Sequence, residues 1–519
     1  MFLYRLIDKY YRLRIDPIGL SLFRIAYSSV VLLEVLQLFY FRAMVYAPSS
    51  TQTTIELTAW IVVVVCLIVG LGTRPATILN YAFTLRFVST LTDWEYHFDY
   101  GMTGMNFILM FMPVSRVLSV DALWRHWRTR TLAKQPQTDL VSALNYTIPI
   151  FVGVGLVYFD SIFHKVTSQI WTQGLGIWVP SSLPQITWHD WSILLNFELI
   201  ALSLGYLTFF FEFAFVFCFW FRKLWLPLFV VGVGLHLGIL ATFPIPLFAL
   251  GNVSFYILLV PVKLWRRLCG HPSSRARESL QDSLPISREN TLRVCSIYLF
   301  LALVTILHLV SIYNSPLLAK VRLQSHFEQT EFGTALARFG RSTLRFSRHY
   351  FGITPHGVFM DSHFMGYEQI IALVHVDIDG TETWLPIIDK NGQPRHYNWG
   401  RNWVKWTFRT NGPQLYEELF LTGLKEFSGF WLGKNGKSLD LARFQIKVKF
   451  IKVPNRWEKD FLTRQKQSPW RDAGTVRWEN GIFKGQCALH HLGVNLGSTK
   501  CTPEGFSHEV APAEAKNQP

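Results

Sequence analysis

Long apolar runs, separated by short polar or basic turns, fill the chain before Tyr313. A membrane helix needs about 20 consecutive apolar residues, and several of these runs reach or approach that length. The pattern predicts about nine membrane-spanning helices, some of them shorter than a usual span. They lie at residues 19–41, 57–71, 76–91, 100–112, 143–166, 193–221, 226–243, from after Pro246 to 262, and at 294–312.

The turns between the runs alternate in charge, and this alternation predicts an orientation. With a cytoplasmic N-terminus, four basic loops face the cytoplasm: those holding Arg74, residues 116–134, Arg222 with Lys223, and residues 263–277. The opposite turns are poor in lysine and arginine and rich in tryptophan. Positive charge marks the cytoplasmic side, so nine spans place the chain from Asn314 onward outside. We therefore expect a multi-pass protein of the cell membrane with an extracytoplasmic C-terminal domain.

After Asn314 the pattern changes to short alternating runs. Strand patterns occupy residues 370–378, 384–388 and 443–453, and Asp379 with Gly380 forms a turn between the first two. Residues 416–427 suit a helix. The predicted fold is a membrane α-helical bundle over residues 1–313, followed by a β-rich extracytoplasmic domain over 314–505. The tail at 506–519, rich in Pro, Ala, Glu and Lys, is expected to be disordered.

The composition agrees with a membrane protein and argues against a soluble enzyme. Half of the 519 residues are hydrophobic and only 16% are charged, and the mean hydropathy is +0.22. The net charge of +15 would suit a nucleic-acid partner, but no nucleic-acid motif accompanies it. In a membrane protein, surplus lysine and arginine mark cytoplasmic loops. We therefore expect membrane lipid, and no nucleic acid, as a partner.

The segment Tyr158–Gly174, at the end of the fifth run, is unusually polar for its depth. It holds Asp160, His164 and Lys165. An ionisable group near the bilayer centre costs roughly 2.5–3.5 kcal/mol, so such groups tend to be paired, hydrated or functional. Asp160 and His164 are four residues apart, as are Ser161 and Lys165, and each pair shares a helix face.

Lys165, His97 and His236 reach the same outer side of the predicted bundle. A lysine desolvated at the membrane edge loses proton affinity and can act as a base; alternatively, it extends to headgroup water. His97 follows an aromatic turn in which Trp94 and Tyr96 suit interfacial anchors. His236 lies among small residues that allow close helix packing, where it is either structural or functional.

Three acidic residues also lie in apolar runs: Glu34, Glu198 and Glu212. The favoured interpretation is that they pair with Arg24 or Arg86 inside the bundle, and the alternative is a proton relay.

Two further sets of residues lie in the C-terminal part. His349, His356 and His363 are seven residues apart, but nearby Gly and Pro predict a turn-rich loop packed on the membrane domain rather than a metal site. We expect no metal ligands in the chain. Cys487 and Cys501 are candidates for a disulfide in an oxidising compartment. There is no phosphate-loop, GxGxxG or GxSxG motif.

The stretch Asp16–Arg24 resembles the opening of the HTTM domain, which vitamin K-dependent gamma-glutamyl carboxylases share with many bacterial membrane proteins. Further stretches similar to those of the carboxylases follow in the same order: residues 94–101, 119–123, 158–165 and the run around His236. The resemblance covers residues 10–265, and a β-rich external domain also fits the carboxylases loosely.

The resemblance implies a lyase-type membrane enzyme that uses reduced vitamin K or a similar quinol, with oxygen and carbon dioxide, to modify an exported peptide or protein. Lys165 falls on the base that deprotonates the quinol, His97 on a histidine near the substrate glutamate, and His236 on another active-site histidine. Asp160, His164, Trp94 and Glu212 would support them. The alternative is a non-catalytic maturation or assembly factor whose external domain binds an exported partner.

Overall fold

The computed structural model describes residues 2–47, 49–91, 93–131, 140–268 and 288–487. Within these residues, six helical segments are long and apolar enough to cross a membrane, which indicates a membrane-embedded protein. They are α2 (Ile18–Tyr40), α4 (Thr51–Val69), Leu144–Lys165, α13 (Glu198–Cys218), Arg222–Thr242 and Thr291–Tyr313. Pro246–Leu259 and Val262–Leu268, bent by 105°, form a seventh span if counted together.

The predicted third and fourth runs are shorter in the structure than a full span. They form α5 (Thr73–Phe87) and α6 (His97–Leu109), of 15 and 13 residues. At 1.5 Å per residue, α6 is roughly 20 Å long, against a hydrocarbon thickness of about 30 Å. The six or seven spans of the described residues therefore do not reach the nine predicted, and α6 begins at the polar turn that carries His97.

Several helices expose large apolar side chains on the outside of the bundle. Such a surface suits contact with lipid rather than water. The most exposed of these side chains on α4 and α13, and on α14 (Trp225–Thr242), are Ile55, Val62, Leu199, Leu207, Phe210, Phe217, Leu226 and Val230.

The fifth span changes its helical winding midway. It consists of α8 (Leu144–Ile150), the π-helical turn η1 (Phe151–Gly155) and α9 (Leu156–Lys165). Pro149 lies inside α8 and lacks the amide hydrogen of a regular helix. The end of this span, α9, packs against α13 and α17 (Arg288–Tyr313), while α14 packs against α15 (Pro246–Tyr256).

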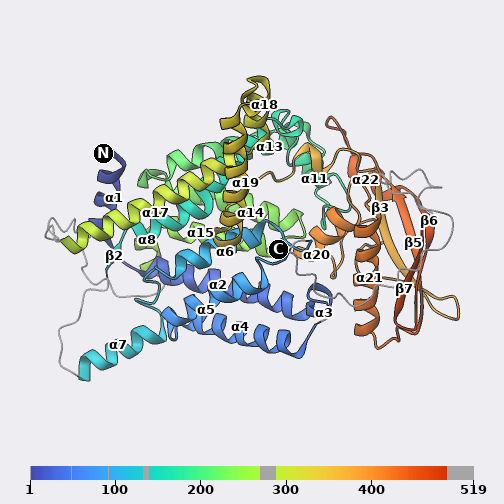
Figure 1. The fold of residues 1–519 in the computed structure, drawn as a ribbon, viewed down its shortest axis with the longest axis horizontal. Helices are drawn as coiled ribbons and strands as arrows, with labels where there is room; N and C mark the ends of the chain where they lie inside the picture. Colours follow the sequence, from blue (N-terminus) through green and yellow to red (C-terminus); the bar gives the residue numbers. More distant parts are fainter. Residues whose placement is uncertain (1, 48, 92, 132–139, 269–287, 488–519) are drawn as a thin grey trace.

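The chain after Tyr313 begins with helices, not with strands. These are α18 (Pro316–Gln324) and α19 (Glu331–Phe351), and α19 runs across the direction of α17 (Figure 1). The β-rich description of residues 314–505 is therefore wrong for residues 316–351, where helices form instead. The placement of a domain boundary at residue 313 stays a prediction, and the tail at 506–519 lies outside the described residues.

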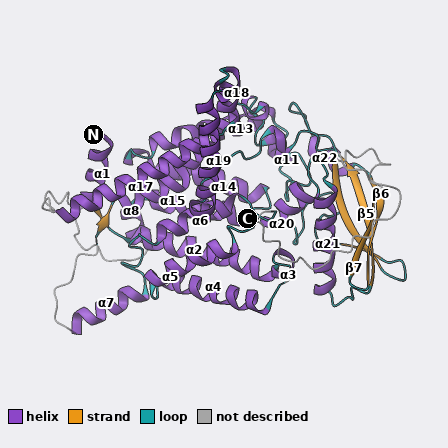
Figure 2. Ribbon diagram, viewed as in Figure 1, coloured by secondary structure: helices purple, strands orange, loops and turns teal. Residues whose placement is uncertain are grey.

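A five-stranded antiparallel sheet lies at one end of the molecule (Figure 2). Its order is β4 (Glu382–Trp384), β3 (Gln369–Val376), β5 (Leu441–Phe450), β6 (Trp470–Glu479) and β7 (Ile482–Cys487). The predicted hairpin is confirmed, with Val374 opposite Trp384. The predicted helix at 416–427 is α21 (Glu417–Lys434), which packs on the sheet through Trp431 and Phe444, with ring centroids 6.0 Å apart.

The strand predicted at 443–453 is β5, and it alternates as expected at Phe444, Ile446 and Val448, which are buried. Lys449 is an exception, because it is buried although the alternation predicts an outward side chain. Its ammonium donates hydrogen bonds to the carbonyls of Lys390 and Lys466, and these replace water.

Short elements complete the described chain. They are α1 (Phe2–Arg12), β1 (Arg14–Ile15) paired with β2 (Val141–Ser142), α3 (Arg42–Val45), α7 (Val120–Thr131), α10 (Gln169–Thr172), α11 (Trp178–Ser181), α12 (Ser192–Leu195), η2 (Arg222–Leu224), η3 (Ile257–Leu259), α16 (Val262–Leu268), η4 (Phe327–Gln329), η5 (Asp361–His363), α20 (Arg401–Val404), η6 (Lys405–Thr410) and α22 (Phe461–Gln467).

Candidate functional site

A cavity inside the bundle brings three of the predicted residues together. His97, Lys165 and His236 all line it, from α6, α9 and α14. Most of its other walls are apolar or aromatic, and its enclosed volume is about 120 Å³. Ligand pockets are commonly lined by apolar side chains with a few placed polar groups, so this lining suits an apolar ligand with a polar head.

Lys165 is buried in the cavity wall and does not extend to headgroup water. Its ammonium donates to the Glu212 carboxylate on α13 and lies 4.0 Å from the centre of the Trp171 ring. The Ser161 hydroxyl donates to the same Glu212 oxygen at 3.0 Å. Ser161 and Lys165 thus share a face, as their spacing predicts, and both point to Glu212.

His236 has a defined tautomer. Its Nδ1 lies 2.9 Å from the Gly232 carbonyl one turn earlier. A carbonyl only accepts, so we assign the proton to Nδ1. Nε2 is then an acceptor, 3.5 Å from the Tyr158 hydroxyl, which in turn lies 2.8 Å from the Tyr256 hydroxyl. The histidine therefore has a structural hydrogen bond and a second nitrogen available on the cavity side.

His97 begins α6 and faces His356 from the loop after α19. Their ring centroids are 4.7 Å apart, and His97 Nδ1 is buried without a partner among the described residues. Burial, together with His356, holds the pKa of His97 well below its usual value. Burial also lowers the pKa of His356 to about 3. Both rings are therefore neutral at physiological pH and can donate or accept hydrogen bonds.

Asp160 and His164 face the loop that carries His356 rather than Lys165. The Asp160 carboxylate accepts the backbone N–H of His356 at 2.7 Å. His164 lies against Gly357, where an added Cβ would be 3.3 Å from its Nδ1. The two residues thus hold the C-terminal loop over the cavity. The sequence predicted that they would support Lys165 instead.

Arg401, a buried arginine of α20, connects the C-terminal part of the chain to the membrane helices. The Arg401 guanidinium donates to Glu34 on α2 at 2.5 Å and to Asp99 on α6 at 2.9 Å. Tyr96 donates its hydroxyl to Glu34 at 2.7 Å and its backbone N–H to Asp99 at 3.0 Å. Arg401 therefore fixes the turn immediately before His97.

The predicted pairing of Glu34 and Glu212 with Arg24 or Arg86 is wrong, and Glu198, at the start of α13, is exposed rather than inside the bundle. Glu34 pairs with Arg401, and Glu212 pairs with Lys165. Arg24 instead donates to backbone carbonyls, including that of Leu118 at 2.6 Å, and Arg86 pairs with Glu56 at 3.5 Å. The Arg24 guanidinium meets carbonyls left free at the ends of neighbouring segments.

Trp94 and Tyr96 are not interfacial anchors. Both are buried, and Trp94 stacks on Phe427 of α21 with ring centroids 6.0 Å apart. The Lys405 ammonium lies 5.1 Å from the Trp94 ring. The C-terminal part covers this turn, so Trp94 supports the domain contact and is absent from the residues that line the cavity.

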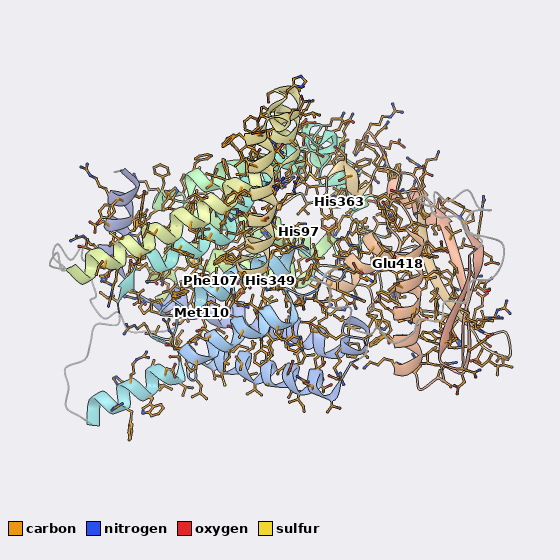
Figure 3. All side chains as sticks on the ribbon, in the orientation of Figure 1. His97, Phe107, Met110, His349, His363 and Glu418 are labelled. Carbon is orange, nitrogen blue, oxygen red and sulfur yellow. The ribbon has the colours of Figure 1, made fainter. Side chains whose placement is uncertain are left out.

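A second pocket adjoins the cavity on the side of the sheet domain. It shares His97, Tyr100 and Phe359 with the cavity and adds His363 and Arg409. Figure 3 labels His97 and His363 near the middle of the molecule, between the membrane helices and the C-terminal helices. Burial and Arg409 lower the pKa of His363. The cavity thus continues toward the sheet domain past two histidines and an arginine.

Several residues of the site did not stand out in the sequence. His308 of α17, Tyr158 and Tyr256 line or adjoin the cavity, and His308 Nδ1 is buried without a partner among the described residues. His308 could have been noticed in the sequence, because it is a histidine inside the last apolar run. Nothing local distinguishes the two tyrosines from the many other aromatic residues.

The three regularly spaced histidines do not form one group. His349 lies in the last turn of α19, His356 in the following loop and His363 in η5. Across the described ranges, no three His, Cys, Asp or Glu side chains are placed to hold a metal ion. The candidate disulfide cannot be placed, because Cys501 and the side chain of Cys487 lie outside the described residues.

Comparisons with known proteins leave the site to be interpreted from its own geometry. No family model, no curated protein and no solved structure matches the chain. The resemblance to the HTTM domain and to the carboxylases therefore stays a prediction, which depends on the order of the motifs quoted from the sequence.

Proposed function

We propose that this protein is a membrane enzyme of the HTTM type that resembles the vitamin K-dependent carboxylases. It would use a quinol-type cofactor to modify an exported peptide or protein. The observation that carries the proposal is the buried Lys165–Glu212 pair, enclosed with His97 and His236 in one largely apolar cavity. A buried charge pair facing an apolar pocket is more typical of a functional site than of a packed core.

The proposed orientation has the N-terminus in the cytoplasm and the sheet domain outside. In Figure 1 the N-terminus and α7 lie at one end of the molecule, and the sheet lies at the other. Basic residues lie at this end, such as Arg74 in the first turn of α5, next to Thr73, which contacts α7, and Arg125 in α7 itself, in agreement with the positive-inside rule. This orientation requires nine crossings, so α5, α6 and the bent pair would each have to cross in addition to the six long spans of the described residues.

Two observations support a quinol as the ligand of this cavity. The apolar walls suit an isoprenoid tail and a ring, and buried polar atoms without partners in the described residues, such as His97 Nδ1 and His308 Nδ1, suit the ring oxygens. When bound with oxygen, a quinol of this type would supply the strong base that carboxylation of an exported substrate requires.

Lys165 would take the hydroxyl proton of the quinol. An amine must be neutral to do so, and Glu212 is the carboxylate to which the ammonium already donates. Transfer of a proton from Lys165 to Glu212 leaves a neutral amine beside a neutral acid. The net charge of the buried pair does not change, so this transfer avoids the cost of one isolated buried charge.

The histidines would orient the ligands on either side of this pair. His236 can accept a hydrogen bond at Nε2, and its Nδ1 is fixed by Gly232. His97 lies where the cavity meets the outer pocket, so it can contact a substrate that enters from the sheet side. In this arrangement the quinol would occupy the apolar cavity, and the exported substrate would enter through the outer pocket, which adds His363 and Arg409.

Oxygen-dependent consumption of reduced vitamin K by the purified protein tests the proposal. We expect wild-type protein to consume the quinol and Lys165→Ala to lose at least 100-fold in rate, as expected when a catalytic base is removed. Lys437→Ala is the matched control, because Lys437 pairs with Asp377 in the sheet domain. Equal consumption by wild type and Lys165→Ala would exclude Lys165 as the base.

One observation favours the alternative, a non-catalytic maturation or assembly factor. The Lys165 charge is already satisfied by Glu212 and Trp171 without any ligand. In that case the double variant Lys165→Met/Glu212→Leu, which removes both charges, would support the cellular role of the protein as well as wild type. Loss of the role in a folded double variant would favour the enzyme.

A further inference from the structure

Helix α19 has three distinct faces. Small residues, among them Gly333, Gly340 and Ser347, are buried against the rest of the protein. A second face carries exposed arginines. The third is an aromatic stripe of Phe332, Phe339 and Phe346, which are 68%, 63% and 53% exposed. The stripe residues are seven apart and therefore lie on one side of the helix.

The packing of α19 gives its depth in the membrane. Its middle lies over the last turn of α17, because a Cβ added at Gly340 would be 3.4 Å from Asn314 and 3.9 Å from Val310. The apolar span in α17 ends at Tyr313. Figure 1 shows α19 running across the direction of α17. The helix thus lies at the level where a span ends and the headgroup region begins.

The arginines of α19 are available to an anionic partner. Arg338, Arg341 and Arg345 are exposed, and among the described residues none of them has an ion pair or hydrogen bond. Glu331 is the single acidic residue of the helix. An apolar stripe beside a basic face, at the depth of the headgroups, is the pattern of a helix that lies in the membrane interface.

We propose that α19 is an interfacial helix. Its phenylalanine stripe enters the boundary between headgroups and acyl chains, and Arg338, Arg341 and Arg345 bind the headgroups of anionic lipids. This lipid contact is independent of the chemistry proposed for Lys165.

The lipid contact bears on the candidate site, because the end of α19 continues into the loop that covers the cavity. The Ser347 hydroxyl donates to the Ile353 carbonyl at 3.0 Å, and the Tyr81 hydroxyl donates to the Tyr350 carbonyl at 2.7 Å. His356 follows three residues after Ile353. Lipid that holds α19 therefore also holds this loop in place.

Spin labels at two positions of full-length protein in phosphatidylcholine vesicles with 25% phosphatidylglycerol test the depth. A nitroxide on Phe339→Cys should collide with oxygen several times more than with a water-soluble nickel chelate. One on Arg341→Cys should show the reverse. Equal access of the chelate at both positions places the stripe in water, and protection from both reagents at 339 places it under protein. Either result overturns the proposal.

A second measurement tests the headgroups. We compare the binding of nitroxide-labelled phosphatidylglycerol and phosphatidylcholine to the protein. The triple variant Arg338→Gln/Arg341→Gln/Arg345→Gln should lose at least about tenfold in preference for the anionic lipid, since each arginine near an anionic surface contributes to binding. The matched control neutralises three exposed sheet-domain arginines, Arg456, Arg464 and Arg477. An unchanged preference in the α19 variant contradicts the proposal.

Discussion

The Lys165–Glu212 pair allows a quantitative test by a double-mutant cycle. The two side chains are 4% and 10% exposed, so both charges are almost fully desolvated. Replacing Lys165 by Met leaves Glu212 with the Ser161 hydroxyl as its remaining hydrogen-bond partner among the described residues. A hydrogen bond to a charged group contributes about 1.5–3 kcal/mol. The ammonium contact with Trp171 adds about 1 kcal/mol.

We therefore expect Lys165→Met to lower the free energy of unfolding by about 3–5 kcal/mol, the usual cost of leaving one buried charge without its partner. Glu212→Leu should cost a similar amount. The double variant should cost clearly less than the sum, because well-packed apolar pairs can replace buried ion pairs. The coupling free energy should then be several kcal/mol.

The assay is reversible unfolding of the purified protein in mixed detergent micelles, followed by circular dichroism. Lys437→Met, in an exposed pair of the sheet domain, serves as the control and should change stability by less than about 1 kcal/mol. Additive effects of the two single variants would refute the description of Lys165 and Glu212 as a coupled buried pair. Such additivity would also remove the proton transfer proposed between them.

Three further outcomes follow from named contacts. Arg401→Met should lower the free energy of unfolding by about 3–5 kcal/mol, because it leaves two buried carboxylates without their cation. Arg477→Met, on the exposed side of the sheet, should leave this free energy nearly unchanged. Burial lowers the pKa of His356 to about 3, whereas an unfolded chain takes up this proton near 6.5. His356 should therefore contribute a loss of stability of up to about 1.4 kcal/mol per pH unit below 6.5, and the pH dependence of stability should be less steep by this amount in His356→Asn. Gly232→Ala should weaken quinone binding several-fold in an equilibrium assay, because its Cβ would collide with the Tyr256 ring, whereas Gly238→Ala, which meets open space, should not.

The polar end of the fifth span could be recognised from the sequence because charge is rare in an apolar run. Asp160, His164 and Lys165 stand out for that reason, and the topology placed Lys165 with His97 and His236. The partner of Lys165 was less accessible. Glu212 was noted as a buried acid, but its predicted pairing with arginine was wrong, since helix packing decides which buried charges meet.

Contacts between the membrane helices and the C-terminal part could not be predicted from local pattern. Glu34 and Arg401 are 367 positions apart, and neither spacing nor periodicity connects them. Packing of the C-terminal part on the membrane helices also explains the burial of Trp94. Its sequence context is that of an interfacial anchor, but it lies under α21. Helix α19 was missed because its periodicity, set by three phenylalanines, lies in a region described as mostly strand.

The short helices α5 and α6 show another limit. Their apolar character is that of membrane segments, but polar turns end them before they reach the length of a full span. Length and hydropathy alone therefore overstate the number of complete crossings. The hairpin and the alternating strand of the sheet were predicted well, because turn residues and the two-residue period are local signals.

Oxygen-isotope labelling of the quinone product tests the central claim most directly. Purified protein is given reduced vitamin K and ¹⁸O₂, and the products are analysed by mass spectrometry. When a quinol reacts with oxygen to form an epoxide, one oxygen atom enters the epoxide and the other leaves as water. We expect an epoxide carrying one ¹⁸O atom from wild-type protein and none from Lys165→Ala. Absence of labelled epoxide from folded wild-type protein would contradict the proposed activity.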